Sequence, residues 1–279
     1  MTPNVYENIE VSIVTHATKI LPELGRKDTL KYPGAPKTEL LSDVIKNIKT
    51  RLGLSLFNIV FDHKIDCNIS QEYLENLRTF CKEEGLRLVI SPSASRIPSQ
   101  ITATNAFNLA VRSVRSNYVM LWEHDHLFDQ DVEWDLIQLA FDRGAEMLRF
   151  NRRENKSTMD QVPEQVSRLS ISERLCRTDY YCNGPFIARR DWVQDLFQCT
   201  LSSPPSFSGP FGAFIEGPIN QMMMRDRFNI DDQEYYKKYP IFLYGGVGEQ
   251  PIVSHFGDFP GRRARWSKKL RQMFLPRAR

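Results

Sequence analysis

Four consecutive residues in the middle of the chain carry side chains that bind divalent cations: Glu123, His124, Asp125 and His126. Carboxylates and imidazole suit Mg²⁺ or Mn²⁺ when other oxygen ligands complete the coordination. The run directly follows the apolar stretch Tyr118 to Trp122 (YVMLW), which we predict to be a buried strand. A loop fixed to a buried strand holds its carboxylates rigidly, as a metal site requires. The alternative interpretation is a polar turn that is rich in charge and binds nothing.

The chain before this motif alternates between strand and helix patterns. Strands are predicted at Val11 to Thr15, Leu56 to Phe61, Leu86 to Ile90 and Tyr118 to Trp122, and helices at Thr38 to Leu52, Ser70 to Glu84 and Thr104 to Val114, with Thr38 and Ser70 as N-caps. This alternation predicts an α/β fold, in which a mainly parallel, Rossmann-like sheet is flanked by helices. Ligands bind such sheets at the carboxyl ends of the strands, where we expect Thr15, Asp62 and Asp125 to lie.

The second half of the chain has a less regular pattern. Strands are predicted at Glu146 to Asn151, Phe186 to Ala188 and Ile241 to Tyr244, and helices at Asp191 to Phe197 and Pro218 to Arg227, with Pro218 at its first helical position. The polar stretch from Glu154 to Glu173 reads as a loop or a surface helix. No internal repeat or linker is visible. We therefore predict one domain over residues 1–279, whose two halves meet near residue 150.

Composition is ordinary for a globular protein, with 41% hydrophobic and 25% charged residues among 279. No apolar run approaches the roughly 20 residues that span a bilayer, and no secretory signal is visible at the N-terminus. The five cysteines include no C-x-x-C pair. These features predict a cytoplasmic protein with reduced thiols.

Basic charge is concentrated at the end of the chain. The net charge is +3, and eight basic and no acidic residues lie between Arg262 and Arg279. Such a tail indicates a local anionic partner and not a nucleic-acid-binding surface. Trp266, Leu270 and Phe274 recur at helical spacing among the basic residues, as in an amphipathic surface helix. Peripheral contact with a membrane and docking onto the protein's own core are both open.

The stretch from Asn105 to His126 resembles a unit of inverting, family-2-like glycosyltransferases with the GT-A fold. In that family a helix and then a strand precede the metal-binding Asp-x-Asp motif, which reads Glu-His-Asp here. The resemblance implies a GT-A-like fold, Mn²⁺ or Mg²⁺ as cofactor, and Asp125 as metal ligand, with Glu123 at the metal or the donor ribose. It also implies a nucleotide-sugar donor, most simply a UDP-sugar, and a glycan acceptor.

Weaker matches follow in the order of the family. Thr15 and His16 end the first strand, where the family holds the nucleotide, and Asp62 ends the second, where it places an acid near the base or ribose. Residues 1–150 would then form the donor-binding half and residues 151–260 the acceptor half, followed by the basic tail, 261–279. Ordinary loop residues are the alternative for all three positions.

The acceptor half contains three further matches. The segment from Gly184 to Arg190 resembles the family's glycine-rich strand that ends in basic residues. The segment from Phe211 to Gly217 resembles the one that supplies the catalytic base, which gives that role to Glu216. The alternative for Glu216 is a charge near a helix start, where the helix dipole favours it. The resemblance further implies His255 as a metal ligand, with an ordinary surface or core histidine as the alternative. It also implies that Arg262 and Arg263, in the basic tail, lie at the pyrophosphate.

Together these features predict a metal-dependent inverting glycosyltransferase in polysaccharide or other glycan biosynthesis. Two alternatives stay open. A sugar nucleotidyltransferase has a similar core, although residues 11–30 lack the glycine-rich loop typical of that class. A catalytically inactive nucleotide- or carbohydrate-binding module would explain why Glu-His-Asp replaces Asp-x-Asp.

Overall fold

The computed structural model describes residues 4–17, 38–97, 99–152, 155, 170–201 and 215–255. The basic tail, with Arg262 and Arg263, lies outside the described residues, as does most of the polar stretch from Glu154 to Glu173. Within the described part, no helix is long and apolar enough to cross a membrane.

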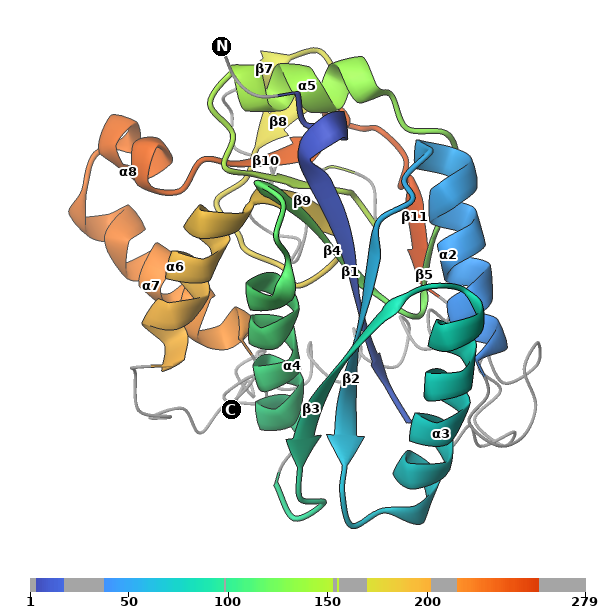
Figure 1. Cartoon of the computed structure of the whole chain (residues 1–279). Helices are drawn as coiled ribbons and strands as arrows, with labels where there is room; N and C mark the ends of the chain where they lie inside the picture. The colour runs from blue at the N-terminus through green and yellow to red at the C-terminus, as the bar shows by residue number, and fades with distance from the viewer. Residues whose placement is uncertain are drawn as a thin grey trace, which may run out of the picture.

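Among the described residues, nine strands form a mixed sheet at the centre of the molecule (Figure 1). Across the sheet the strands are β3 (Arg87–Ser93), β2 (Phe57–Lys64), β1 (Ile9–His16), β4 (Tyr118–Glu123), β9 (Phe186–Arg189), β6 (Met147–Arg149), β10 (Ile241–Tyr244), β8 (Leu175–Arg177) and β7 (Ser170–Ser172). Strands β1 to β4, β6 and β10 run in the same direction, and β9 and β8 run against them. A second sheet pairs β5 (His126–Phe128) with β11 (Val253–His255).

Helices cover both faces of the large sheet, which confirms the predicted α/β class. The helices are η1 (Tyr6–Asn8), α2 (Glu39–Leu52), α3 (Asn68–Glu83), α4 (Ser99–Ser113), α5 (Trp134–Asp142), α6 (Arg190–Leu201), α7 (Glu216–Asn229) and α8 (Asp232–Lys238). Alternate residues of a strand point to opposite faces. Hence Ile13 and Met120 pack with α2, α3 and α5, whereas Val14 and Leu121 pack with α4, α6 and α7.

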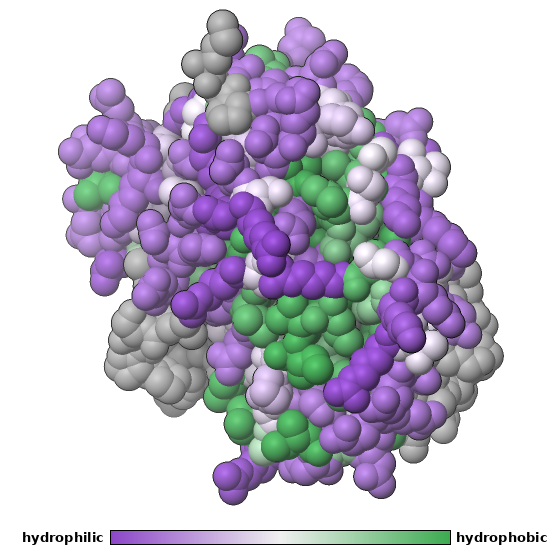
Figure 2. Space-filling model, viewed as in Figure 1, coloured by the Kyte–Doolittle hydropathy of each residue, from purple (hydrophilic) through white to green (hydrophobic). Residues whose placement is uncertain are grey.

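The edge strand β3 is less buried than its neighbours. Leu88, Val89 and Ile90 are all half-buried, whereas the core of β2 is buried. Hydrophilic residues cover most of the view in Figure 2, and hydrophobic residues gather over the middle, where β3 and β2 lie.

Every strand and helix predicted in the regular first half exists, but several bounds differ. Strand β2 extends three residues past Phe61, so Asp62 lies inside the strand and not after it. The prediction of Ser70 as an N-cap is wrong, because α3 begins at Asn68 and Cys67 occupies the cap position. The Ser70 hydroxyl instead accepts a hydrogen bond from the Lys64 backbone N–H and contacts His63. Thr38 is the N-cap residue of α2 but makes no capping hydrogen bond.

Two further bounds need correction. Helix α4 starts at Ser99, five residues before the predicted start at Thr104. Helix α7 starts at Glu216, so Pro218 is its third residue and not its first. Proline is tolerated there because the first-turn N–H groups have no partner within the helix.

Candidate functional site

The carboxyl ends of the parallel strands meet at one edge of the sheet and bring the predicted polar residues together. Glu123 is the last residue of β4, and the ladder with β1 continues one residue further through a hydrogen bond from the His124 N–H to the Val14 carbonyl (3.1 Å). The motif then turns, and His126 begins β5. The buried indole of Trp122 donates to the His126 carbonyl (2.9 Å), which fixes the turn from beneath.

Three side chains of the motif form a cluster suited to a cation. One ligand atom each from Glu123, Asp125 and His126 lies within 4.8 Å of the other two. The Nδ1 atom of His126 is 3.2 Å from Oδ1 of Asp125 and 3.4 Å from Oε2 of Glu123. The imidazole is fully buried, whereas the side chains of Glu123 and Asp125 are 29% and 13% exposed. Two carboxylates that converge at a strand end fit Mg²⁺ or Mn²⁺.

Arg152 joins this cluster to the segment before β9. Its Nη1 donates to Nε2 of His126 (2.8 Å), and its Nη2 lies 3.8 Å from Sγ of Cys182. A Cβ atom at Gly184 would lie 3.2 Å from Nε of Arg152, a tighter contact than nearly all real Cβ atoms make. The absence of a side chain at Gly184 therefore lets the guanidinium reach the histidine.

Glu216 faces the same segment. It is the first residue of α7, and its Oε1 accepts a hydrogen bond from the backbone N–H of Asn183. Burial, with the charge of Glu216 next, raises the pKa of Tyr180 to about 12. Burial and the same charge also raise the pKa of Cys182. The charges of Glu216 and Arg152 both affect the pKa of Cys182. Glu216 therefore lies within electrostatic range of the segment that Arg152 connects to His126. The position of Glu216 at the start of α7 also fits the alternative interpretation, in which its charge is stabilised by the helix dipole.

The three predicted nucleotide contacts differ in their surroundings. Thr15 is fully buried, and its hydroxyl lies 2.8 Å from that of Tyr73, so the Thr15 side chain is turned away from any ligand. His16 is exposed, and its ring stands 4.7 Å from that of His124. Asp62 pairs in register with His16 on the neighbouring strand.

Asp62 has two polar neighbours. Its Oδ2 accepts a hydrogen bond from Thr102 (2.8 Å), and Nζ of Lys64 lies 3.6 Å from its Oδ1. The Asp62 carboxylate is therefore held in place two residues before the end of β2, and β1 lies between β2 and the strand that carries the candidate cation site.

His255 is paired directly with His126 through β11 and β5. Strand β11 is positioned by Asn151, whose side chain donates to the Gln250 carbonyl (3.0 Å), and whose carbonyl accepts from the Ile252 N–H (3.1 Å). On the other side, Asn47 of α2 fixes β5 by hydrogen bonds to both backbone groups of Phe128. The backbone of His255 thus lies beside the motif, and its role as a metal ligand stays a prediction.

Two arginines of this region have no motif that marks them in the sequence. Arg149, the last residue of β6, is fully buried, and its Nη1 donates to the Tyr180 carbonyl (3.0 Å). No described carboxylate lies within salt-bridge distance of Arg149. Arg152 follows three residues later. The signal available in the sequence was the strand predicted to end at Asn151, since ligand-binding residues collect just past such ends.

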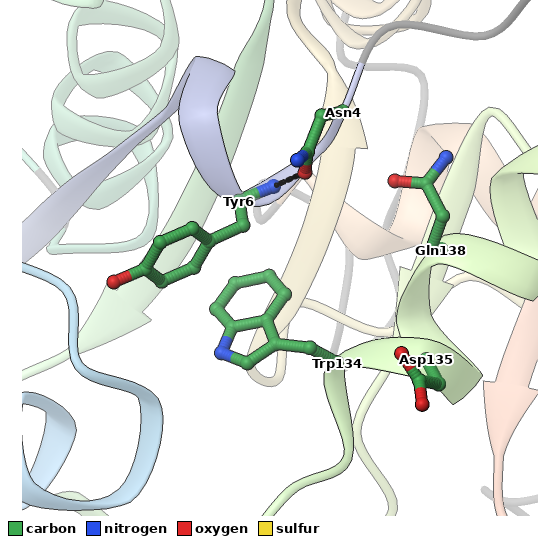
Figure 3. Close-up of a pocket in the computed structure, with 5 residues that line it drawn as sticks. All are labelled: Asn4, Tyr6, Trp134, Asp135 and Gln138. Carbon is green, nitrogen blue, oxygen red and sulfur yellow. Dashed lines mark hydrogen bonds between the residues drawn. The ribbon is translucent and has the colours of Figure 1, made fainter.

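A separate pocket lies at the opposite edge of the sheet, where β1 begins. It has a volume of about 500 Å³ and is lined by Asn4, Tyr6, Trp134, Asp135 and Gln138. Figure 3 shows the Tyr6 and Trp134 rings side by side, with centroids 4.9 Å apart. The Gln138 amide already bonds Val5 and Asp142, and the Trp134 indole bonds the Leu52 carbonyl. The pocket holds no residue predicted for the site and offers few unused polar groups.

No protein-family model matches the sequence, and no curated protein sequence matches it significantly. Several solved structures are similar to this chain at low identity. A nucleoside-diphosphate-sugar pyrophosphorylase from Vibrio cholerae is 10% identical, with a TM-score of 0.48, over 92% of this chain and 99% of that one. TarS from S. aureus is 12% identical, with a TM-score of 0.46, over 89% of this chain and 60% of that one.

A mannosyltransferase from Pyrobaculum calidifontis, solved with GDP-Man and Mn²⁺, is 13% identical, with a TM-score of 0.44, over 95% of this chain and 61% of that one. Similarity at this level concerns the arrangement of helices and strands. The chain spans about three fifths of the length of the solved TarS chain, which is TarS 1-349, and of the solved mannosyltransferase chain.

Proposed function

We propose that this chain is a metal-dependent inverting glycosyltransferase that moves a sugar from a nucleotide donor to a hydroxyl acceptor. The observation that supports it most is the pair Glu123 and Asp125, which converge at the carboxyl end of β4. Arg152 connects this pair to the segment that contacts a third carboxylate, Glu216. One acidic pair for a cation and one separate carboxylate for a proton are the two chemical functions that single displacement needs.

The donor side of the reaction falls to the first half of the chain. Glu123 and Asp125 would hold Mn²⁺ or Mg²⁺, and the bound cation would neutralise the charge that develops on the leaving diphosphate. His16 ends β1 and pairs with Asp62 of β2, so the two residues would contact the nucleoside of a UDP-sugar or a similar donor. His255 would lie near the cation. Arg262 and Arg263, which follow it closely in sequence, would reach the pyrophosphate.

The acceptor side falls to the second half. Glu216 would accept the proton of the acceptor hydroxyl as its oxygen attacks the anomeric carbon. The hydrogen bond from the Asn183 N–H leaves one carboxylate oxygen of Glu216 for this task. Attack from the side opposite the leaving diphosphate inverts the anomeric centre. The acceptor would be a glycan or another hydroxyl compound in glycan biosynthesis.

A sugar nucleotidyltransferase remains the second candidate, because it also needs a cation beside phosphates. The two reactions differ in the nucleophile. A sugar phosphate is already ionised near neutral pH and needs no base, whereas an alcohol must lose a proton. A separate carboxylate at the position of Glu216 therefore favours transfer to a hydroxyl over nucleotidyl transfer. Loss of Glu216 would leave a nucleotidyltransferase active.

The experiment that tests the proposal is a panel of nucleotide sugars, measured for binding and hydrolysis with Mn²⁺, with Mg²⁺ and with chelator. We expect one donor to bind only with a cation, and Asp125→Asn to lose that dependence. Asp195→Asn, an exposed aspartate on α6, is the matched control and should behave like the wild type. Cation-dependent binding that persists in Asp125→Asn would place the site elsewhere. Release of pyrophosphate from a nucleoside triphosphate and a sugar phosphate would instead identify the nucleotidyltransferase.

A further inference from the structure

We propose that the pocket between η1 and α5 is a carbohydrate-binding site that holds a sugar unit of a glycan. The pocket has a volume of about 500 Å³, which lies within the range of small-molecule sites, roughly 300–1,000 Å³. It lies where β1 begins, whereas the candidate cation site lies at the carboxyl ends of the strands. The pocket therefore goes beyond the proposed function, because it plays no part in the chemistry at the donor.

Two aromatic rings form one wall of the pocket. Tyr6 of η1 and Trp134, the first residue of α5, meet edge to face, with ring centroids 4.9 Å apart. Tyr6 is 46% exposed and Trp134 is half-buried, so ring surface stays open to a ligand. The face of an aromatic ring carries partial negative charge, and the C–H groups on the flat side of a sugar ring carry partial positive charge. Sugar rings therefore stack on such faces.

Hydrogen bonds hold both rings in place before a ligand arrives. The Trp134 indole donates to the Leu52 carbonyl (3.0 Å), and the Tyr6 hydroxyl lies 3.5 Å from the Gly53 carbonyl. The backbone N–H of Tyr6 donates to Oδ1 of Asn4 (3.0 Å). Because the wall is already ordered in the free protein, a ligand loses little of its binding free energy to ordering it.

Two polar groups of the lining are left for a ligand. Both ends of the Gln138 amide are used, by the Val5 N–H and by Asp142. Among the described residues, neither the Asp135 carboxylate nor the amide nitrogen of Asn4 has a hydrogen-bond partner. Figure 3 shows Tyr6 to one side of the Trp134 ring, and Asp135 and Gln138 to the other. A ligand in the pocket thus meets one acceptor and one donor beside the rings.

This combination selects the chemistry of the ligand. Neighbouring hydroxyls of a sugar satisfy both groups, because a hydroxyl donates and accepts. An ammonium group has only donors, so its N–H groups would face those of Asn4. An apolar ligand would leave the Asp135 carboxylate without a partner. The two rings meet at 75°, so they form no parallel-sided slot for a flat nucleobase.

The distance between the two sites sets the length of a glycan that could use both. Strand β1 runs from this pocket to His16 over eight residues, about 25 Å at roughly 3.3 Å per residue. A glycan that reaches from one site to the other must contain several sugar units. The second contact would raise the affinity for long acceptors and leave short ones unaffected. This consequence alone rests on the proposed function.

Binding is tested by NMR of the protein labelled with ¹⁵N-tryptophan, whose four tryptophans give four indole N–H signals. The signal of Trp134 is the one lost in Trp134→Phe, and that of Trp122 the one lost in Trp122→Phe. The probes are cellohexaose, maltohexaose, chitohexaose and mannohexaose, with tetramethylammonium and uridine as non-sugar probes. We expect at least one hexasaccharide to shift the Trp134 signal and leave the Trp122 signal in place. No shift with any hexasaccharide, or a shift with tetramethylammonium or uridine alone, would overturn the proposal.

Variants assign the binding to the pocket. Tyr6→Ala removes a ring from η1, in which no residue is buried, so the fold should persist. Loss of this ring should raise the dissociation constant of the bound hexasaccharide about tenfold or more. Asp135→Ala removes the acceptor and should raise it by a similar factor. Asp195→Ala, at an exposed position of α6, is the control and should bind like the wild type. Equal affinities in the wild type, Tyr6→Ala and Asp135→Ala would contradict the assignment.

The carbohydrate site and the proposed function can fail separately. Cation-dependent donor binding without a response of Trp134 to any hexasaccharide would overturn the carbohydrate site alone. A response of Trp134 to a hexasaccharide in a protein that binds no donor would support the carbohydrate site and overturn the glycosyltransferase. If both hold, Tyr6→Ala should raise KM for a long acceptor while kcat, and KM for a short acceptor, stay unchanged.

Discussion

Replacing Glu216 by glutamine removes the proposed base while keeping its shape. The Oε1 atom of the amide still accepts the hydrogen bond from the Asn183 N–H, so the side chain keeps its place. The amide has no basicity near neutral pH, however, and cannot take the acceptor proton. General-base catalysis contributes about 10²- to 10⁴-fold, which corresponds to about 2.7–5.5 kcal/mol of the activation barrier.

Alanine at the same position provides a comparison with a different expected signature. Glu216→Ala leaves the N–H of Asn183, a buried residue, without its acceptor. An unsatisfied buried donor costs about 1–3 kcal/mol of stability. Glu216→Gln should thus lose transfer alone, and Glu216→Ala should lose transfer and stability together.

The assay combines the transfer rate at saturating donor and acceptor, the dissociation constant of the donor and unfolding in urea. The reasoning is refuted if Glu216→Gln retains more than about a tenth of the wild-type rate, well above the expected range. It is also refuted if donor binding falls by the same factor as transfer, because a base that touches only the acceptor should not affect the donor.

Three further predictions concern stability and thiol chemistry. Gly246→Ala should lower the melting temperature far more than Gly85→Ala. The new Cβ at position 246 would lie 1.9 Å from a backbone carbonyl oxygen, whereas a Cβ at position 85 meets open space and only the positive φ is unfavourable. Calorimetry should give a difference in melting temperature of at least about 2–4 °C. Burial would raise the pKa of Asp226, but hydrogen bonds from a lysine and a tyrosine outweigh it and lower the pKa. Because the pKa of Asp226 is lower in the folded state, its ionised form stabilises the protein at pH values above the unfolded pKa of about 3.9, and this stabilisation is lost as the pH falls. Unfolding free energies measured between pH 6 and 3 should therefore fall more steeply in the wild type than in Asp226→Asn. Burial raises the pKa of Cys81 to about 11, so alkylation followed by mass spectrometry should label the half-buried Cys67 first, and equal rates would contradict this.

The parts of the fold that the sequence predicted are those with a local signal. The strands and helices of the first half have a clear period of two or 3.6 residues, and burial in the structure follows it. Helix α5 had the same signal in Leu136, Ile137, Ala140 and Phe141, and it was overlooked. Strands β5 and β11 have three residues each, too few for a period, and they form because residues far apart in sequence pair.

The candidate site likewise divides into residues with a local sequence signal and residues whose roles depend on contacts between distant parts of the chain. The motif from Glu123 to His126 was visible because its charges are adjacent in sequence. The role of Arg152 was not visible, since it depends on contacts with His126, 26 residues away, and Cys182, 30 residues away. Burial of the Thr15 side chain against Tyr73 could not be predicted either, because strand spacing alone does not reveal which helix covers a strand end.

The hydrogen bond between the Trp122 indole and the His126 carbonyl couples the fluorescence of a buried tryptophan to the turn that carries the candidate cation site. The indole is shielded from water, and its ring centre lies 6.4 Å from that of the histidine. Any event that shifts the turn above it changes the polarity and hydrogen bonding that set its fluorescence. Paramagnetic Mn²⁺ held by the carboxylates should quench that emission where Mg²⁺ does not. The chain has four tryptophans, so the part of the emission that is lost in Trp122→Phe would report occupancy of the site without a label.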